Sequence, residues 1–173
     1  MTDNAMQLHK RAVAEMKKKR WLPAIKLLEN RSVVVEENWR FSQDLGWCYF
    51  QLDKFEDARK HMVRATRLAP ENPACKCGLG MVYIMSKHFS KAEVVLRESL
   101  TMEESLLARI GLALAYLSQG KVEDAERIHL EGIRLKPRSS RRHACYAAFL
   151  SDVGRETEAL IMEKKAWKLR RLN

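Results

Sequence analysis

The chain has 173 residues, of which 46% are apolar, and this is enough for a sizeable core in one domain spanning residues 1–173. Seven glycines and four prolines are too few for long disordered linkers, and no apolar run approaches the roughly 18 residues of a membrane span. The 32 basic and 22 acidic side chains give a net charge of +10, so acidic partners are favoured over basic ones.

Helix signals begin near the N-terminus, and no strand pattern interrupts them. Residues 5–19 predict a first helix. Pro23 fits the first turn of a second helix, because a proline there loses no hydrogen bond. Asn38 is expected to cap the next helix, which runs through Phe50.

Further helix starts and ends follow along the chain. Two sequences resemble capping boxes and one is a cap followed by proline: Asp53 with Glu56, Thr101 with Glu104, and Asn72-Pro73. Gly120 and Gly154 are expected to end helices at equivalent places, and the last helix should run from about Glu156 to Arg170. We therefore predict an all-α chain of ten helices in five antiparallel pairs.

A fixed period runs through these helices. Alanines recur at spacings of 34, 34, 33 and 34 residues: Ala24, Ala58, Ala92, Ala125 and Ala159. Other residues keep step with them, namely tyrosines nine residues earlier and small residues twelve earlier: Tyr49, Tyr83, Tyr116, Gly46, Gly80, Ala113 and Ala147. Small residues let two helix backbones approach closely, and a period of this length indicates stacked helix pairs.

The pattern resembles the tetratricopeptide repeat. The second copy carries it as Leu45-Gly46, Tyr49, Ala58, Ala65 and Pro70, and the third and fourth copies repeat most of it. The resemblance implies a right-handed α-solenoid of about five helix-turn-helix repeats, at approximately 5–38, 39–72, 73–105, 106–139 and 140–173. The one-residue shortening is expected in the turn near Thr101.

The resemblance also implies that the first helix of each pair lines a concave groove. Its positions in copies two to four are largely apolar: Arg40, Gln43, Trp47, Phe50, Cys77, Met81, Ile84, Leu107, Ile110 and Leu114. We expect this groove to bind an apolar peptide or an amphipathic helix of another protein. The alternative is that these side chains pack on one another as core.

The positive charge gathers at the two ends of the chain. We expect a basic patch formed by Lys17, Lys18, Lys19, Arg20, Arg138, Arg141 and Arg142, with more lysines and arginines from Lys164 to Arg171. These residues either solvate the end helices or attract acidic protein or phospholipid surfaces. Nucleic acid is disfavoured, because no aromatic residues alternate with the basic runs to stack on bases.

No arrangement typical of catalysis is present, and we predict a non-enzyme without metal or cofactor. Cys75 and Cys77 would point about 200° apart on a helix, and no second pair matches them. With no signal peptide visible, we expect reduced thiols and a cytoplasmic location. The leading hypothesis is a protein-interaction scaffold or adaptor. The alternatives are a secretion-chaperone-like repeat protein and a scaffold that self-assembles through its terminal repeats, where Trp167 either packs inward or forms the contact.

Overall fold

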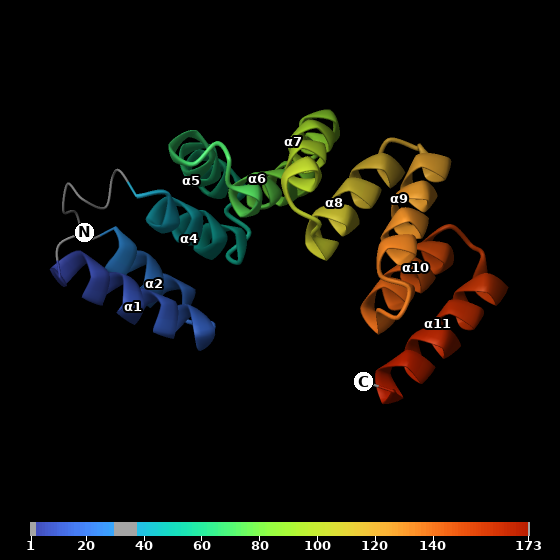
Figure 1. The fold of residues 1–173 in the computed structure, drawn as a ribbon. Coiled ribbons are helices and arrows are strands. Elements are labelled where there is room, and N and C mark those ends of the chain that lie inside the picture. Colours follow the sequence, from blue (N-terminus) through green and yellow to red (C-terminus); the bar gives the residue numbers. More distant parts are fainter. Residues whose placement is uncertain (1–2, 30–37, 173) are drawn as a thin grey trace. The chain divides into compact units, whose positions relative to one another are not determined.

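The computed structural model describes residues 3–29 and 38–172, and these residues form ten α-helices and no strand (Figure 1). The predicted all-α class and helix number are therefore confirmed for the described residues. Residues 30–37, which belong to the predicted first repeat at 5–38, lie outside them. The chain divides into two compact units, Met1–Glu103 and Glu104–Asn173. The expectation of a single domain stays a prediction.

The first unit contains three helix pairs. Its helices are α1 (Asp3–Lys17), α2 (Trp21–Leu28), α4 (Trp39–Phe50), α5 (Phe55–Leu68), α6 (Pro73–Met85) and α7 (Phe89–Met102). Each first helix packs on its own second helix, and α2 packs on α4 as α5 does on α6. The first helices also contact one another, α1 with α4 and α4 with α6. They therefore share one wall of this unit.

The second unit contains two pairs built in the same way. Its helices are α8 (Leu106–Leu117), α9 (Val122–Leu135), α10 (Ser140–Asp152) and α11 (Glu156–Arg171). Helix α9 packs against both α8 and α10, and α11 packs on α10 (Figure 1). The last helix has the predicted extent to within one residue.

The repeated small residues lie where the helices of a pair meet. The five alanines of the period are at most 3% exposed. A Cβ added to Gly80 would lie 2.4 Å from the Leu96 Cγ. At this point α6 and α7 are therefore so close that position 80 has no room for a side chain. The sequence pattern of small residues is thus the pattern of helix contacts within each pair.

One turn geometry recurs between the two helices of every pair. A residue with left-handed backbone stands at the same place in all five copies, with φ between 57° and 78°: Lys19, Asp53, Lys87, Gly120 and Gly154. The next residue then donates its backbone N–H to the carbonyl at the repeat's tyrosine position, at 2.8 to 3.0 Å. The predicted capping box at Asp53 is wrong, because this residue forms the left-handed turn and Lys54 precedes α5 without a side-chain cap.

The links between pairs differ from prediction at one place. Asn38 and Asn72 cap α4 and α6 as expected. The capping box predicted at Thr101 is wrong, because α7 continues to Met102 and Ser105 caps α8. The shortening does fall there: residues 103–105 link α7 to α8, whereas four residues, 69–72 and 136–139, form the corresponding links elsewhere.

Candidate functional site

In the first unit, the predicted groove residues are mostly engaged in packing. Trp47 and Phe50 stack with ring centroids 5.3 Å apart and pack against the core beside Met62. Cys77 is only 6% exposed, so its side chain belongs to the interior. Half-buried Gln43 accepts a weak bond from the Cys75 thiol at 3.9 Å. The side chains of this wall are thus partly covered by their neighbours.

The remaining predicted residues of this unit differ in exposure. Arg40 is exposed, and its guanidinium lies 4.8 Å from the centre of the neighbouring Trp39 ring. Met81 and Ile84 on α6 are half-buried. A polar contact also lies on this wall, where His9 Nε2 is 2.7 Å from the Asp44 carboxylate and joins α1 to α4.

In the second unit, two of the predicted residues border a hollow of about 140 Å³. It is lined from α8, α9 and α10 by Ile110, Ala113, Leu114, Leu117, His129, Cys145, Ala148, Phe149 and Asp152. Leu114 is 38% exposed at its edge, and Leu107 is 45% exposed without lining the hollow. The structure thus brings Ile110 and Leu114 to one concave surface, which we call the α8–α10 hollow.

Two polar groups of the α8–α10 hollow, His129 and Cys145, carry no charge near neutral pH. His129 lies 5.1 Å from the Phe149 ring, and burial lowers the pKa of its imidazole to about 4. Burial also raises the pKa of the Cys145 thiol above its usual value, so the thiol is protonated at pH 7. Asp152 is exposed at the end of α10 and makes no hydrogen bond or ion pair within the described residues. It is the acidic member of an otherwise apolar lining.

A buried ionic network fixes α8 relative to α10. Glu104, in the shortened turn, accepts bonds of 2.8 to 3.0 Å from Arg109 and one of 2.8 Å from Arg142. Arg142 also donates to the Gly132 carbonyl at 3.1 Å. The bonds from Arg109, and then those from Arg142, hold the pKa of the Glu104 carboxyl below its usual value. The network therefore joins α8, α9 and α10, the three helices that line the hollow.

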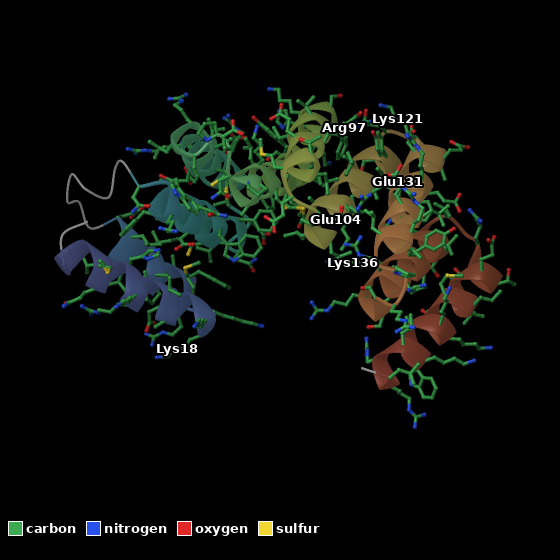
Figure 2. All side chains as sticks on the ribbon, viewed as in Figure 1. Lys18, Arg97, Glu104, Lys121, Glu131 and Lys136 are labelled. Carbon is green, nitrogen blue, oxygen red and sulfur yellow. The ribbon has the colours of Figure 1, made fainter. Side chains whose placement is uncertain are left out.

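Arg142 was expected in an exposed basic patch, and the structure corrects this. Its side chain is 4% exposed, because it enters the unit between α9 and α10 to reach Glu104 and Gly132. Arg138 and Arg141 are exposed as predicted. Figure 2 shows Glu104 at the start of α8, where it receives this guanidinium.

The N-terminal basic residues are exposed but partly neutralised. All four residues from Lys17 to Arg20 are exposed, and Lys18 extends from the end of α1 (Figure 2). Lys18 and Arg20 both lie within ion-pair distance of Glu15, at 3.8 and 3.1 Å. This run therefore has a smaller effective charge than its sequence indicates.

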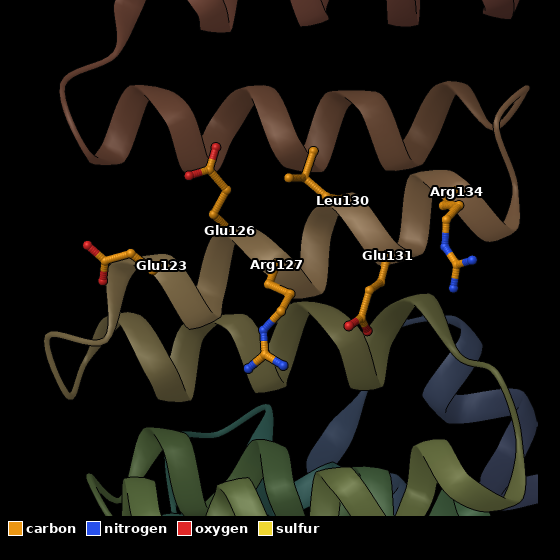
Figure 3. A pocket seen from close by; sticks show the side chains of 6 residues that line it. All are labelled: Glu123, Glu126, Arg127, Leu130, Glu131 and Arg134. Atoms are coloured by element: carbon orange, nitrogen blue, oxygen red, sulfur yellow. The ribbon is translucent and has the colours of Figure 1, made fainter.

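A second depression lies on α9 and is a charged surface rather than a site (Figure 3). All of its lining residues come from this helix: Glu123, Glu126, Arg127, Leu130, Glu131 and Arg134. Glu126 accepts bonds from Tyr146 and Arg155, and Glu131 pairs with Arg109. Arg127 pairs with Asp124. Most of these charges are thus satisfied within the unit.

Of the nine residues that line the α8–α10 hollow, the predicted groove list contains only Ile110 and Leu114. Phe149 and Asp152 lie on α10 outside the assumed groove positions, and His129 lies on a second helix. A pattern restricted to first helices cannot find His129. No group of three or more His, Cys, Asp or Glu side chains in the described part of the chain is arranged to hold a metal ion. None of the helices described here is long and apolar enough to cross a membrane.

Helical hairpins of fixed period, joined by one turn geometry and packed through small residues, define an α-solenoid of helix-turn-helix repeats. The family model for the tetratricopeptide repeat matches residues 40–72, so the chain contains a tetratricopeptide repeat at the place of the predicted second copy.

Solved structures of MamA have the same fold. A MamA fragment from Desulfovibrio magneticus, residue 41 to the end, gives a TM-score of 0.79 at 17% identity, with 100% of this chain and 98% of that chain covered. A further crystal structure of MamA gives 0.73 at 20% identity, covering 92% and 94% of the two chains. At this identity the likeness shows the fold alone.

Among curated proteins, the chain is similar to a mouse (Mus musculus) protein, BBSome complex member BBS4. The two are 27% identical over 127 residues, which is 70% of this chain. The matched region is only 24% of the relative's length, so the chain spans about a quarter of it.

Proposed function

We propose that the chain is a non-catalytic adaptor whose α8–α10 hollow takes one large apolar side chain from a peptide or amphipathic helix of another protein. The observation that carries this proposal is the concave apolar lining around Leu114. A side chain that stays 38% exposed beside a hollow is accessible to a ligand, whereas a core leucine is not.

The size of the hollow fits a single side chain. A cavity of about 150 Å³ lined by aliphatic and aromatic groups holds a benzene-sized molecule, and this hollow has about 140 Å³. Burying a leucine or phenylalanine side chain contributes about 1.5–3 kcal/mol. One anchor therefore supplies part of a micromolar affinity, and the rest must come from contacts along neighbouring first helices.

The charges around the hollow indicate which ligand side chains should lie next to the apolar anchor. His129 is neutral at pH 7 and adds no charge to the wall. Asp152, without a partner in the described residues, favours a lysine or arginine of the ligand one turn from the apolar anchor. The mouse relative is named as a member of a complex, and this supports the same kind of role here, as a subunit that holds another protein.

The test uses amphipathic-helix peptides selected from a displayed library and measures their binding by fluorescence anisotropy. Leu114→Asp should weaken binding at least about tenfold, since loss of one anchor costs 1.4 kcal/mol or more. The control is Leu130→Asp, which changes a leucine on α9 outside the hollow that is 48% exposed, and it should leave binding unchanged. Urea unfolding must show that Leu114→Asp folds normally. If this variant unfolds, Leu114 is core and the proposal fails.

Cys145 supplies a direct report of occupancy. It lines the hollow and is half-buried, whereas the other three cysteines are buried. A bound peptide should slow its alkylation by a maleimide several-fold. Equal alkylation rates with and without saturating peptide would place the peptide elsewhere.

A further inference from the structure

The outward face of α11 combines apolar and basic side chains, and nothing in the described residues covers it. Leu160, Ile161 and Trp167 are 54%, 58% and 57% exposed. Lys164, Lys168 and Arg171 are also exposed. They lie on the same side of the helix as Leu160 and Trp167, because residues 160, 164, 167, 168 and 171 are three or four positions apart or adjacent on that side. The opposite side carries Ala159 and Ala166, which are buried. We call these six exposed residues the α11 face.

The charge on this face is of one sign. Residues 159–172 contain five basic side chains and one acidic one, Glu163. The two earlier glutamates of the helix are engaged at its start, Glu156 with Ser151 and Glu158 with Arg155. No carboxylate of the described residues pairs with the three basic groups of the α11 face. They are therefore available to an anionic surface.

Trp167 is held at the surface rather than packed inside. The Arg171 guanidinium lies 4.7 Å from the centre of its ring and covers one side of the indole. An inward position for Trp167, one of the two predicted, is thus not the observed one. Exposed tryptophan flanked by leucine, isoleucine and basic side chains is the composition of helices that lie in the headgroup region of a bilayer.

We propose that the α11 face docks onto an anionic phospholipid surface, with Leu160, Ile161 and Trp167 entering the headgroup boundary and the three basic residues contacting acidic headgroups. A second copy of the same face fits poorly, because a two-fold contact brings like charges together. An acidic protein would satisfy the charges but needs matching pockets for three apolar side chains. A bilayer boundary accepts both at once. The inference is independent of the α8–α10 hollow.

The experiment is co-sedimentation of the full chain with vesicles of phosphatidylcholine alone or with 30% phosphatidylserine. Binding is expected only to the anionic vesicles and should weaken with salt. Each basic residue near such a surface is worth about a fivefold change in binding. The variant Lys164→Gln/Lys168→Gln/Arg171→Gln should therefore bind about a hundredfold more weakly.

The matched control removes the same charge elsewhere. Lys26→Gln/Lys54→Gln/Lys136→Gln changes three exposed basic residues outside α11 and should keep most of the binding. Trp167→Ala and Leu160→Ser test the apolar part, and each should reduce binding at least about tenfold in salt that screens the charges. Equal loss in both triple variants would mean attraction by net charge alone and would overturn the proposal.

Two other outcomes would also overturn it. One is failure of the natural chain to sediment with anionic vesicles while it binds a polyglutamate peptide, which would identify an acidic protein as the ligand. The other is a dimer, measured by analytical ultracentrifugation, that Trp167→Ala abolishes, which would assign the α11 face to self-association.

Discussion

The ionic network at Glu104 gives a quantitative test of how the second unit is held together. In Glu104→Gln the shape of the side chain is kept and its charge is removed. Arg142, which is 4% exposed, then keeps neutral acceptors at the amide oxygen and the Gly132 carbonyl but loses the negative charge that pairs with its guanidinium. Breaking a buried ion pair from one side costs about 3–5 kcal/mol. Since Glu104 is 29% exposed and partly screened by water, we expect a loss of about 2–3 kcal/mol of unfolding free energy.

The expected mechanism is a stranded guanidinium, and a double-mutant cycle isolates it. Arg142→Met removes that guanidinium and keeps the bulk of the side chain, while Glu104 still binds Arg109. In the Arg142→Met background, Glu104→Gln should therefore cost at least about 1 kcal/mol less than it does alone. Urea unfolding followed by circular dichroism measures all four chains with a shared slope.

Glu103→Gln is the control for this cycle, because Glu103 is exposed beside Glu104 and has no partner in the described residues. It should change stability by less than about 0.5 kcal/mol. The reasoning is refuted if Glu104→Gln costs no more than this control, or if the two changes add without coupling.

Three further outcomes follow from the packing, the turns and the hollow. Gly80→Ala should destabilise by about 1–3 kcal/mol in thermal or urea unfolding, because its Cβ would overlap Leu96; an unchanged midpoint would contradict the close approach. Lys87→Gly should stabilise by up to about 1 kcal/mol, since the left-handed turn costs lysine more than glycine; a loss of stability would refute this. The lowered pKa of His129 means that the unfolded chain binds its proton first, so stability should fall by at most about 3 kcal/mol from pH 6.5 to 4. His129→Phe should flatten that part of the pH profile.

The fold was predictable because the same residue types recur at the positions where the helices of each repeat contact one another. Ala58 and its equivalents are buried where the helices of each pair pack together, and alanine occupies this position in all five repeats. Gly120 and Gly154 marked their turns because glycine favours left-handed backbone. The sequence around Asp53, in contrast, indicated a helix cap and not a turn. An aspartate three residues before a glutamate resembles a cap, and only the alignment of all five turns shows that it has the same role as Gly120.

The candidate site was predictable in part. Sequence periodicity indicates on which side of a helix a residue lies, but it does not indicate how deeply the side chain is buried. Ile110 and Leu114, two of the predicted groove residues, line the α8–α10 hollow, and their role in binding stays a prediction. Cys77 occupies the same kind of position and is buried, since the packing of its neighbours covers it. Arg142 read as a surface charge because its partner Glu104 lies 38 residues earlier, and a pairing over that separation leaves no mark in local sequence. The groove ligand and the secretion-chaperone alternative stay predictions.

The shared turn has a consequence for how such a chain can change length. Asp53 and Lys87 have the same backbone conformation, and the residue after each closes the turn with the same hydrogen bond. Excising residues 54–87 would join Asp53 to His88 without altering the local geometry of either segment. A splice at these points exchanges one whole module for another, so duplication or loss of one complete repeat is a conservative event for this architecture, whereas a cut that removes part of a repeat is not.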